Sequence, residues 1–263
     1  MQLNMTGHVA LVCGGSKGIG KAIALALAAE GALPVLISRT KENLLETREE
    51  IEKITGVVSG IIIGDVSDMQ FPQLAVNETI AKYGQLDILI NNAGGPAMGS
   101  FFSHTEEVWA NAIQQNLLSV IRFTKAAAPL MLERGYGRIL NITSVLAKEP
   151  MPSMVISSTL RAGISAFSKA TSKELIEKGV TINTICPSAV LTERAFQLTI
   201  QAAKEKNIIF EDALARSVSE LPIKRLADPA ELGNVAAFLC SPLASYITGV
   251  SLMVDGGSSR SIF

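Results

Sequence analysis

Gly14-Gly15-Ser16-Lys17-Gly18-Ile19-Gly20 is the stretch that decides the fold. It follows a short apolar stretch, His8–Cys13, and leads directly into an apolar stretch of helical spacing, Ile19–Glu30. Glycine suits such a loop because the turn needs unusual dihedral angles, and because a Cβ would keep a pyrophosphate away from the N–H groups at the helix start. A strand, a glycine-rich turn and a helix in this order predict a dinucleotide-binding βαβ unit.

Short β-branched stretches and longer helical stretches continue to alternate along the rest of the chain. This pattern predicts an α/β protein, a single-domain doubly wound Rossmann fold over residues 1–263, with a seven-stranded parallel sheet flanked by helices. The expected strands are His8–Cys13, Leu33–Ile37, Val57–Ile63, Asp87–Ile90, Gly137–Ile142, Thr181–Ile185 and Ser251–Val254. The expected helices are Ile19–Glu30, Lys41–Ile54, Pro72–Tyr83, Glu106–Arg134, Ser153–Lys178 and Pro229–Ser241. Ligands should lie beyond the carboxyl ends of the strands.

Residues 190–225 are the one irregular insertion in this alternation. They are mixed in charge and roughly helical, and they stand between the sixth expected strand and the helix that begins at Pro229. A segment of this length beside the ligand crevice predicts a substrate lid. A plain surface helix pair is the alternative.

Composition excludes several classes of partner. The 263 residues include 23 basic and 24 acidic side chains, a net charge of −1, so neither a nucleic-acid nor an anionic-membrane partner is expected. The longest apolar run, Ala22–Ala29, is too short to span a bilayer, and the first residues lack the features of a signal peptide, so a cytoplasmic location is expected. Three scattered cysteines and two histidines predict free buried thiols and no metal site.

The end of the second expected strand indicates which dinucleotide is bound. It reads Leu36-Ile37-Ser38-Arg39-Thr40 and holds no acidic residue for a ribose 2′-hydroxyl group. Arg39 offers a planar fork for a 2′-phosphate, and Lys17 in the glycine loop adds a second positive charge. NADP(H) is therefore expected rather than NAD(H), the alternative being an ordinary solvated arginine at a strand end.

These residues resemble the short-chain dehydrogenase/reductase family over essentially the whole chain. The glycine loop is similar to the family's TGxxxGxG motif, with Cys13 in place of threonine, and Asn91-Asn92-Ala93-Gly94 is similar to its NNAG motif. Asn141-Ile142-Thr143-Ser144 resembles its NISS motif, Pro187–Thr192 its PGxVxT segment with Ser188 for glycine, and Asp255-Gly256-Gly257 its DGG. Together with the charge argument, the resemblance implies a cofactor site of Gly14, Ser16, Lys17, Gly18, Ile19, Gly20, Ser38, Arg39, Asp65, Val66, Asn92, Ala93, Gly94, Arg161, Pro187, Val190 and Thr192.

The chain departs from the family's pattern at the catalytic YxxxK motif. By its spacing from Ser144, the tyrosine position is held by Ser157 and the lysine position by Arg161, while Tyr83, Tyr136 and Tyr246 are the three tyrosines and all lie elsewhere. A serine hydroxyl is a far weaker acid than a phenol, and a guanidinium group stays protonated and cannot relay protons. The resemblance implies catalytic positions at Asn116, Ser144, Ser157 and Arg161, without the usual proton donor.

Three hypotheses follow from this departure. The first is an NADPH-dependent reductase of a small conjugated enone, in which Ser144, Ser157 and Asn116 donate hydrogen bonds and water delivers the proton. The second is an ordinary ketone or 3-oxoacyl reductase whose acid is Lys148, the substrate or a water on Ser157. The third is a non-catalytic NADP(H)-binding sensor or scaffold. We favour a reductase of an enone or carbonyl substrate, because a scaffold has no need of Ser144 and Asn116.

The carboxyl-terminal tail adds a weaker resemblance. Ser245-Tyr246-Ile247-Thr248-Gly249, Asp255–Ser258 and Ser261-Ile262 are similar to the tail of tyrosine-less reductases of the bacilysin and aeruginosin pathways, which suggests secondary-metabolite biosynthesis. If the substrate carries a carboxylate, Arg161, Lys148 or Arg194 would be placed to bind it, and surface charge is the alternative for the last two.

The family resemblance also implies self-association. Its members commonly form tetramers through two long helices and the last strand, and Glu106–Arg134, Ser153–Lys178, Ala236–Cys240 and Ile262-Phe263 are apolar enough for such contacts. We therefore expect a homo-oligomer, a tetramer or a dimer, that acts on a small-molecule substrate.

Overall fold

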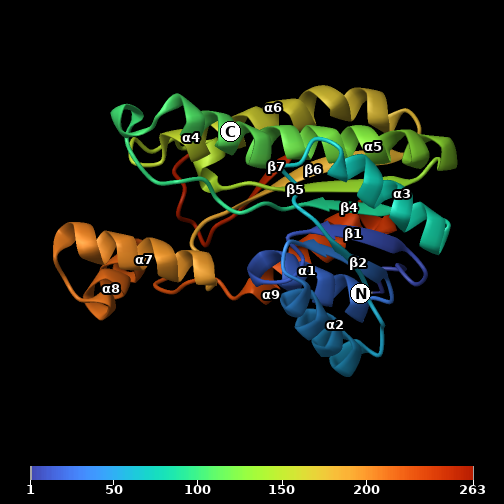
Figure 1. The fold of residues 1–263 in the computed structure, drawn as a ribbon, viewed down its shortest axis with the longest axis horizontal. Coiled ribbons are helices and arrows are strands. Elements are labelled where there is room, and N and C mark those ends of the chain that lie inside the picture. Colours follow the sequence, from blue (N-terminus) through green and yellow to red (C-terminus); the bar gives the residue numbers. More distant parts are fainter. Residues whose placement is uncertain (1, 263) are drawn as a thin grey trace.

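The computed structural model describes residues 2–262 and shows one parallel sheet between two layers of helices (Figure 1). Within these residues, seven strands lie in the order β3-β2-β1-β4-β5-β6-β7. Their bounds are β1 Val9–Cys13, β2 Leu33–Ser38, β3 Gly60–Ile63, β4 Ile88–Asn91, β5 Gly137–Ile142, β6 Val180–Pro187 and β7 Ser251–Val254. The predicted doubly wound fold is confirmed, and the strand order reverses between β1 and β4, where such sheets bind ligands.

The helices cover both faces of this sheet. One face carries α1 (Gly18–Ala29), α2 (Lys41–Thr55) and α9 (Pro229–Cys240), and the other carries α3 (Phe71–Tyr83), α5 (Ser119–Arg134) and α6 (Val155–Ile176). Each layer packs on its own apolar cluster, so the strands are apolar on both faces, as in other covered parallel sheets. No helix within residues 2–262 combines the length and the apolar character needed to cross a membrane.

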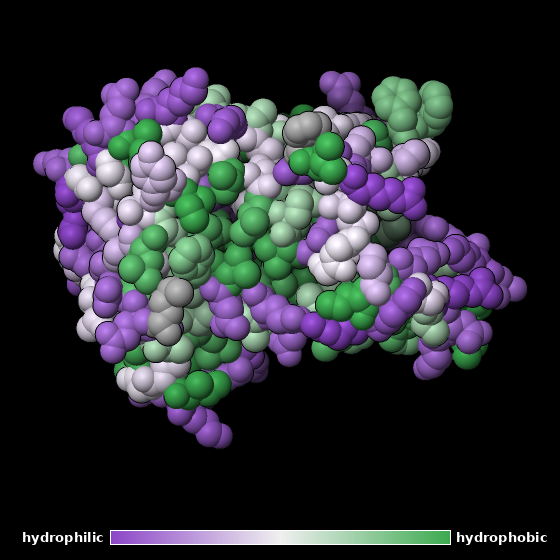
Figure 2. Space-filling model, turned by 180° about the vertical axis from the view of Figure 1, so that it is seen from behind, coloured by the Kyte–Doolittle hydropathy of each residue, from purple (hydrophilic) through white to green (hydrophobic). Residues whose placement is uncertain are grey.

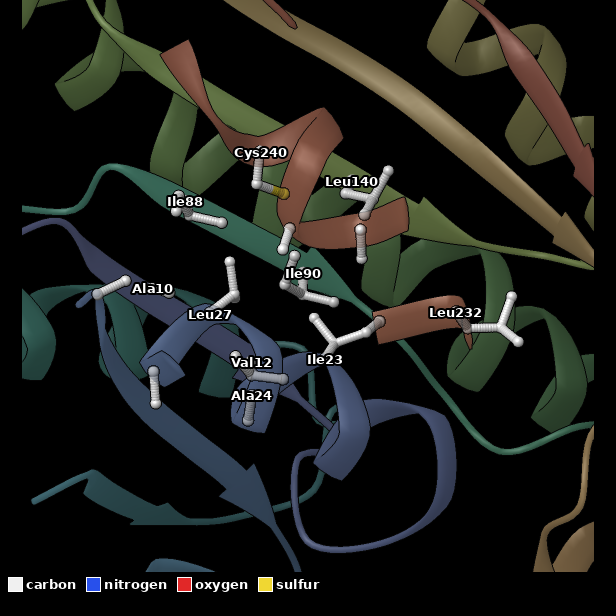
Figure 3. Packing of buried hydrophobic residues seen from close by; sticks show 14 of the residues in the cluster. Ala10, Val12, Ile23, Ala24, Leu27, Ile88, Ile90, Leu140, Leu232 and Cys240 are labelled. Atoms are coloured by element: carbon white, nitrogen blue, oxygen red, sulfur yellow. The ribbon is translucent and has the colours of Figure 1, made fainter. Parts of the chain in front are cut away.

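The core between α1, α9 and the sheet is tightly packed (Figure 3). A Cβ on Gly233 of α9 would lie 2.7 Å from the carbonyl oxygen of Ala22 in α1, so the two helix backbones approach each other directly. Burial of each large apolar side chain in such a layer stabilises the fold by about 1.5–3 kcal/mol. The side chains that meet there are Ala10, Val12, Ile23, Ala24, Leu27, Ile88, Ile90, Leu140, Leu232 and Cys240.

Most elements differ from the predicted ranges by one to three residues at an end, and the differences at β3 and at the helix expected over Glu106–Arg134 have physical reasons. Strand β3 begins at Gly60 rather than Val57, because Val35 pairs with Gly60 and the next position back on β2 is Pro34, which has no N–H group to donate. The long helix expected over Glu106–Arg134 is interrupted. It consists of α4 (Glu106–Ala112), a π-helical turn η2 (Ile113–Leu118) and α5. π-Helical turns are rare in proteins, but where they occur they are often part of a functional site.

The insertion after β6 is a pair of helices, α7 (Glu193–Lys206) and α8 (Phe210–Glu220), as its roughly helical character predicted. A narrow neck attaches this hairpin to the body: the Leu191 N–H group donates to the Ala227 carbonyl (2.9 Å), and the Ala227 N–H group donates to the Ala189 carbonyl (3.0 Å). The hairpin stands out from the body in Figure 1, and its surface is mostly hydrophilic in Figure 2.

Candidate active site

The glycine loop joins β1 to α1 at the carboxyl edge of the sheet. Gly14 and Gly18 have positive φ angles of 60° and 54°. A Cβ on Gly20 would lie 2.1 Å from the Gly14 carbonyl oxygen, so this position accepts no side chain. The Asn92 amide nitrogen donates to the carbonyls of Cys13 and Gly14 at 3.4 Å, which holds the loop against the segment after β4. Because no side chain caps α1, its first N–H groups are open to a phosphate.

Two positive side chains flank this loop, and each contacts a carboxylate. Arg39 after β2 lies 3.7 Å from Asp65 after β3, and both side chains are largely exposed. The pKa of the Asp65 carboxyl group lies below its usual value. Burial raises this pKa, but hydrogen bonds from Ser67 and the charge of Arg39 together lower it by more, so the carboxyl group is ionised. The Lys17 ammonium group lies 3.2 Å from Glu193 at the start of α7. Such exposed pairs are weak, so both cations are available to a phosphate.

A buried chain of polar side chains crosses the sheet beneath the predicted catalytic positions. The Asn91 amide on β4 donates to the Asn141 side chain on β5 (2.8 Å), and the Asn141 amide donates to the Ser168 hydroxyl on α6 (2.8 Å). Ser168 also accepts a hydrogen bond from Thr184 on β6 (3.1 Å). These bonds fix the ends of three strands relative to α6. The sequence analysis did not predict the roles of Ser168 and Thr184. The available signal was that each is a polar residue inside an otherwise apolar stretch.

Ser144 and Ser157 present hydroxyl groups at this edge. Ser144 follows β5, and its oxygen accepts from the Leu146 N–H group at 3.3 Å, which leaves its hydroxyl hydrogen free to donate. Ser157 lies in the first turn of α6 with only 4% of its surface exposed, and it makes no side-chain hydrogen bond to another described residue. Both hydroxyls therefore keep their donor capacity.

Arg161 lies one helical turn after Ser157 and is 8% exposed. One guanidinium nitrogen, Nη1, donates to the carbonyl of Ile142 at the end of β5 (2.6 Å), while the buried Nε has no partner. Burial lowers the pKa of Arg161 to about 10, Cys186 opposes the shift and Arg194 adds to it. The site therefore holds a buried cation with an unused donor.

Asn116 lies in the π-helical turn and is 1% exposed. Its amide nitrogen donates to the Ala112 carbonyl of its own helix at 3.2 Å, whereas its buried side-chain oxygen has no partner. The amide NH2 group has a second N–H, so the hydrogen-bond donor predicted from the sequence stays a prediction, and the free oxygen adds an acceptor.

Comparison with known proteins agrees with this architecture. A protein-family profile described as enoyl-(acyl carrier protein) reductase matches residues 14–259. The NADPH-dependent reductase BacG of Bacillus subtilis is 35% identical over 259 residues, which are 98% of this chain and all of BacG. The chain belongs to the short-chain dehydrogenase/reductase family.

Two solved structures of reductases are closely similar. YwfH, an NADPH-dependent reductase involved in bacilysin biosynthesis, has a TM-score of 0.92 and 34% identity, with 97% of this chain and 99% of YwfH covered. L-sorbose reductase from Gluconobacter frateurii, solved with NADPH and L-sorbose, has a TM-score of 0.94 and 31% identity, with both chains covered completely. The chain is thus an oxidoreductase of the short-chain dehydrogenase/reductase family.

The tyrosines of this family member lie away from the carboxyl edge. A Cβ on Gly60, the first residue of β3, would lie 2.3 Å from the Tyr83 hydroxyl oxygen, so Tyr83 is at the amino edge. Tyr136 directly precedes β5, and the Arg138 guanidinium lies 4.3 Å from its ring centre. Burial raises the pKa of Tyr136 to about 12. Tyr246, ahead of β7, is fully exposed.

Further residues of the predicted cofactor site gather around the reductase's β1 and β4. Val66, Asn92 and Ala93 line one small pocket together with Cys13. The Val190 side chain is buried in the core cluster with α1 and α9, so a contact of Val190 with the cofactor would be made by its backbone. Thr192 caps α7 and its methyl group lies against Gly18, which brings the base of the hairpin onto the glycine loop.

A cavity lies beside this group of residues. It has a volume of about 90 Å³ and extends from the loop after β6 to the end of β7. Its lining includes Ser188, Ile223 and Asp255 but none of the proposed catalytic residues.

All three cysteines are free and buried, as predicted. The Cys186 thiol lies 3.2 Å from the Thr143 hydroxyl under the site.

Proposed function

We propose that this protein is an NADPH-dependent reductase that transfers a hydride to a small conjugated enone without a tyrosine acid. The observation that carries the proposal is the buried pair Ser157 and Arg161 on one face of α6, where the family resemblance implies tyrosine and lysine. No tyrosine among residues 2–262 lies at this edge to replace the phenol.

The residues present fit NADP(H). The first N–H groups of α1, directly after the glycine loop, carry no side-chain cap and can bind a phosphate, and Arg39 and Lys17 supply charge for a 2′-phosphate. The unpartnered Arg161 Nε is a donor and the unpartnered Asn116 oxygen is an acceptor, so a hydroxyl group such as that of a ribose suits both. Similar proteins support this assignment, since BacG is named NADPH-dependent and L-sorbose reductase was solved with NADPH.

Bound NADPH supplies the hydride. Ser144 and Ser157 donate hydrogen bonds to the carbonyl oxygen of the substrate, where negative charge develops as the hydride reaches the β-carbon. Arg161 adds a fixed positive charge in a region with little water, which strengthens this stabilisation. The enolate then takes a proton from water at its α-carbon. The products are the saturated ketone and NADP⁺.

An enone suits this set of residues better than a simple ketone. Reduction of a ketone produces an alkoxide that needs a proton at once, and neither a serine hydroxyl nor a guanidinium group is acidic enough to supply it efficiently. An enolate is a much weaker base because its charge is delocalised, so hydrogen bonds suffice until water protonates it. An ordinary ketone reductase using Lys148 or a water on Ser157 is the competing function.

We assign two further roles on the same basis. The α7–α8 hairpin is a substrate lid, supported by its narrow neck and by the contact of Thr192 and Glu193 with the glycine loop.

The protein is a homo-oligomer, a tetramer or a dimer, supported by exposed Leu243, Tyr246 and Leu252 in and before the edge strand β7. Light scattering after size exclusion tests the second role. Phe263, part of the predicted contact, lies outside the described residues.

Fluorescence titration tests the cofactor assignment. We expect NADPH to bind more tightly than NADH, and the Arg39→Gln variant to lose most of this preference because the 2′-phosphate loses its bidentate partner. The exposed Arg216→Gln variant on α8 is the control and should retain it. If NADH binds at least as tightly as NADPH in the unmodified protein, the assignment to Arg39 is overturned.

NADPH oxidation with matched enones and saturated ketones tests the reaction. We expect turnover with enones and little with ketones. The double variant Ser157→Tyr, Arg161→Lys should gain ketone reduction, because it restores a phenol beside an amine. Thr159→Tyr, on the exposed side of the same helix, adds a phenol outside the site and should gain none. Efficient ketone reduction by the unmodified protein would contradict the proposal. NADPH binding without any turnover would favour the sensor hypothesis. That result would also contradict a role in secondary-metabolite biosynthesis like that of YwfH.

A further inference from the structure

Arg194 on α7 crosses from the base of the hairpin to the loop after β4. Its Nη2 donates to the Pro96 carbonyl at 2.7 Å, and a Cβ on Gly95 would lie 3.2 Å from its Nε. Burial lowers the pKa of Arg194, as it does for Arg161. Arg194 is therefore a half-buried, positioned side chain and not a freely solvated surface charge.

A second and a third positive charge lie on the same side of the site. Arg161 donates to the Ile142 carbonyl at the end of β5, and Arg194 donates to the Pro96 carbonyl in the loop after the neighbouring strand β4. The charge of Arg194 also lowers the pKa of Arg161. Lys148 and Arg161 both act on the thiol of Cys186 at the end of β6. The two guanidinium groups thus lie beyond the carboxyl ends of β4 and β5, whereas the glycine loop and its cations lie beyond β1 and β2.

The acidic side chains around this cluster already have partners. Asp255 accepts from the N–H groups of Gly257 (3.1 Å) and Ser259 (2.9 Å), and it also acts on Cys186 from the end of β7. Glu193 pairs with Lys17.

Glu149 is engaged too, since it accepts from the N–H groups of Arg260 and Ser261. Within residues 2–262, no carboxylate lies within salt-bridge distance of Arg161 or Arg194. A buried guanidinium group and a half-buried one at the same edge of the sheet, both without an acidic partner, are costly, and an anion that enters the site reduces this cost.

We propose that Arg194 binds a carboxylate of the substrate, so that the enone reduced by this enzyme is an oxo acid. An arginine fork matches a carboxylate in two parallel hydrogen bonds, and Arg161 and Lys148 add to the field that attracts the anion. Arg194 is thereby a specificity-determining residue at the base of the hairpin, and carboxylate binding brings the hairpin and the loop after β4 together. The inference rests on the proposed reductase site for its location.

The competing source of an anion is the pyrophosphate of the cofactor, and binding measurements separate the two. The probes are levulinate and methyl levulinate, titrated calorimetrically into the protein saturated with NADP⁺. We expect levulinate to bind more tightly than its ester. Arg194→Met should weaken levulinate binding by about ten- to a hundredfold, the range for hydrogen bonds between charged groups, and leave binding of the ester and of NADPH unchanged. Arg194→Lys should restore part of the affinity, and Arg216→Met should have no effect.

Equal binding of levulinate and its ester overturns the carboxylate assignment, as does a loss of NADPH affinity in Arg194→Met as large as the loss for levulinate. Turnover distinguishes this failure from failure of the reductase proposal, using trans-acetylacrylate and its methyl ester. If both are reduced with equal kcat/KM, and Arg194→Met leaves both unchanged, the reductase stands and the carboxylate site falls. If neither is reduced but levulinate binding depends on Arg194, the carboxylate site stands and the enone reductase falls.

Discussion

Replacing Arg161 with methionine should make the cofactor-free protein more stable while abolishing its function. Burial holds the pKa of Arg161 down at about 10, and the fall from its usual value corresponds to about 3 kcal/mol against the charged form in the folded state. Methionine fills a similar volume without this cost. It also removes the hydrogen bond to the Ile142 carbonyl, and an unsatisfied buried carbonyl costs about 1–2 kcal/mol. The net expectation is a gain of about 1–2 kcal/mol.

The pH dependence of the unmodified protein follows from the same shift. Because the folded-state pKa of Arg161 lies below its unfolded value, the penalty is fully present at neutral pH and is relieved as pH rises through about 10. The advantage of Arg161→Met over the unmodified protein should therefore stay constant from neutral pH up to about 9 and shrink as pH rises above about 10. It should not shrink between pH about 6 and 8, because Arg161 is fully charged in both states there.

Urea unfolding and thermal melting, each with and without NADPH, measure these effects. The cofactor-free Arg161→Met protein should melt a few degrees higher than the unmodified protein, and added NADPH should raise its melting temperature much less. Arg161→Lys keeps a buried charge and should show no gain. A cofactor-free Arg161→Met protein that is less stable than the unmodified one would refute the reasoning, since the guanidinium would then be a net stabilising group.

Two further predictions concern the cofactor loop. Gly20→Ala should abolish NADPH binding, because the new Cβ would lie 2.1 Å from the Gly14 carbonyl oxygen. The control is Gly56→Ala, at an open helix end with φ of 76°, which should cost about 1 kcal/mol of stability and leave the NADPH affinity intact. Similar NADPH titrations for both variants would contradict this prediction. Glu193→Gln should tighten NADPH binding about twofold at low salt and not at high salt, because it frees Lys17 from an exposed ion pair. Unchanged or weaker binding at low salt would show that this ion pair does not compete with the phosphate of the cofactor.

The fold was largely predictable because its determinants are local. Apolar periodicity located the strands and most helices, and the glycine loop located the switch point between β1 and β4. The errors fell where a neighbouring element decides. The start of β3 depends on Pro34 in the adjacent strand, and the π-helical turn at Asn116 is invisible to a periodicity that reads Glu106–Arg134 as one helix.

For the candidate site, the sequence by itself determined which side chains stand at the carboxyl ends of the strands, and that serine and arginine occupy the spacing of the family's tyrosine and lysine. These follow from residue order along the chain. Only the tertiary structure decided which atoms lack partners: Arg161 Nε and the Asn116 oxygen are unsatisfied, and Arg194 reaches Pro96. Burial and hydrogen bonding depend on distances between residues far apart in the chain, and no local pattern records those distances.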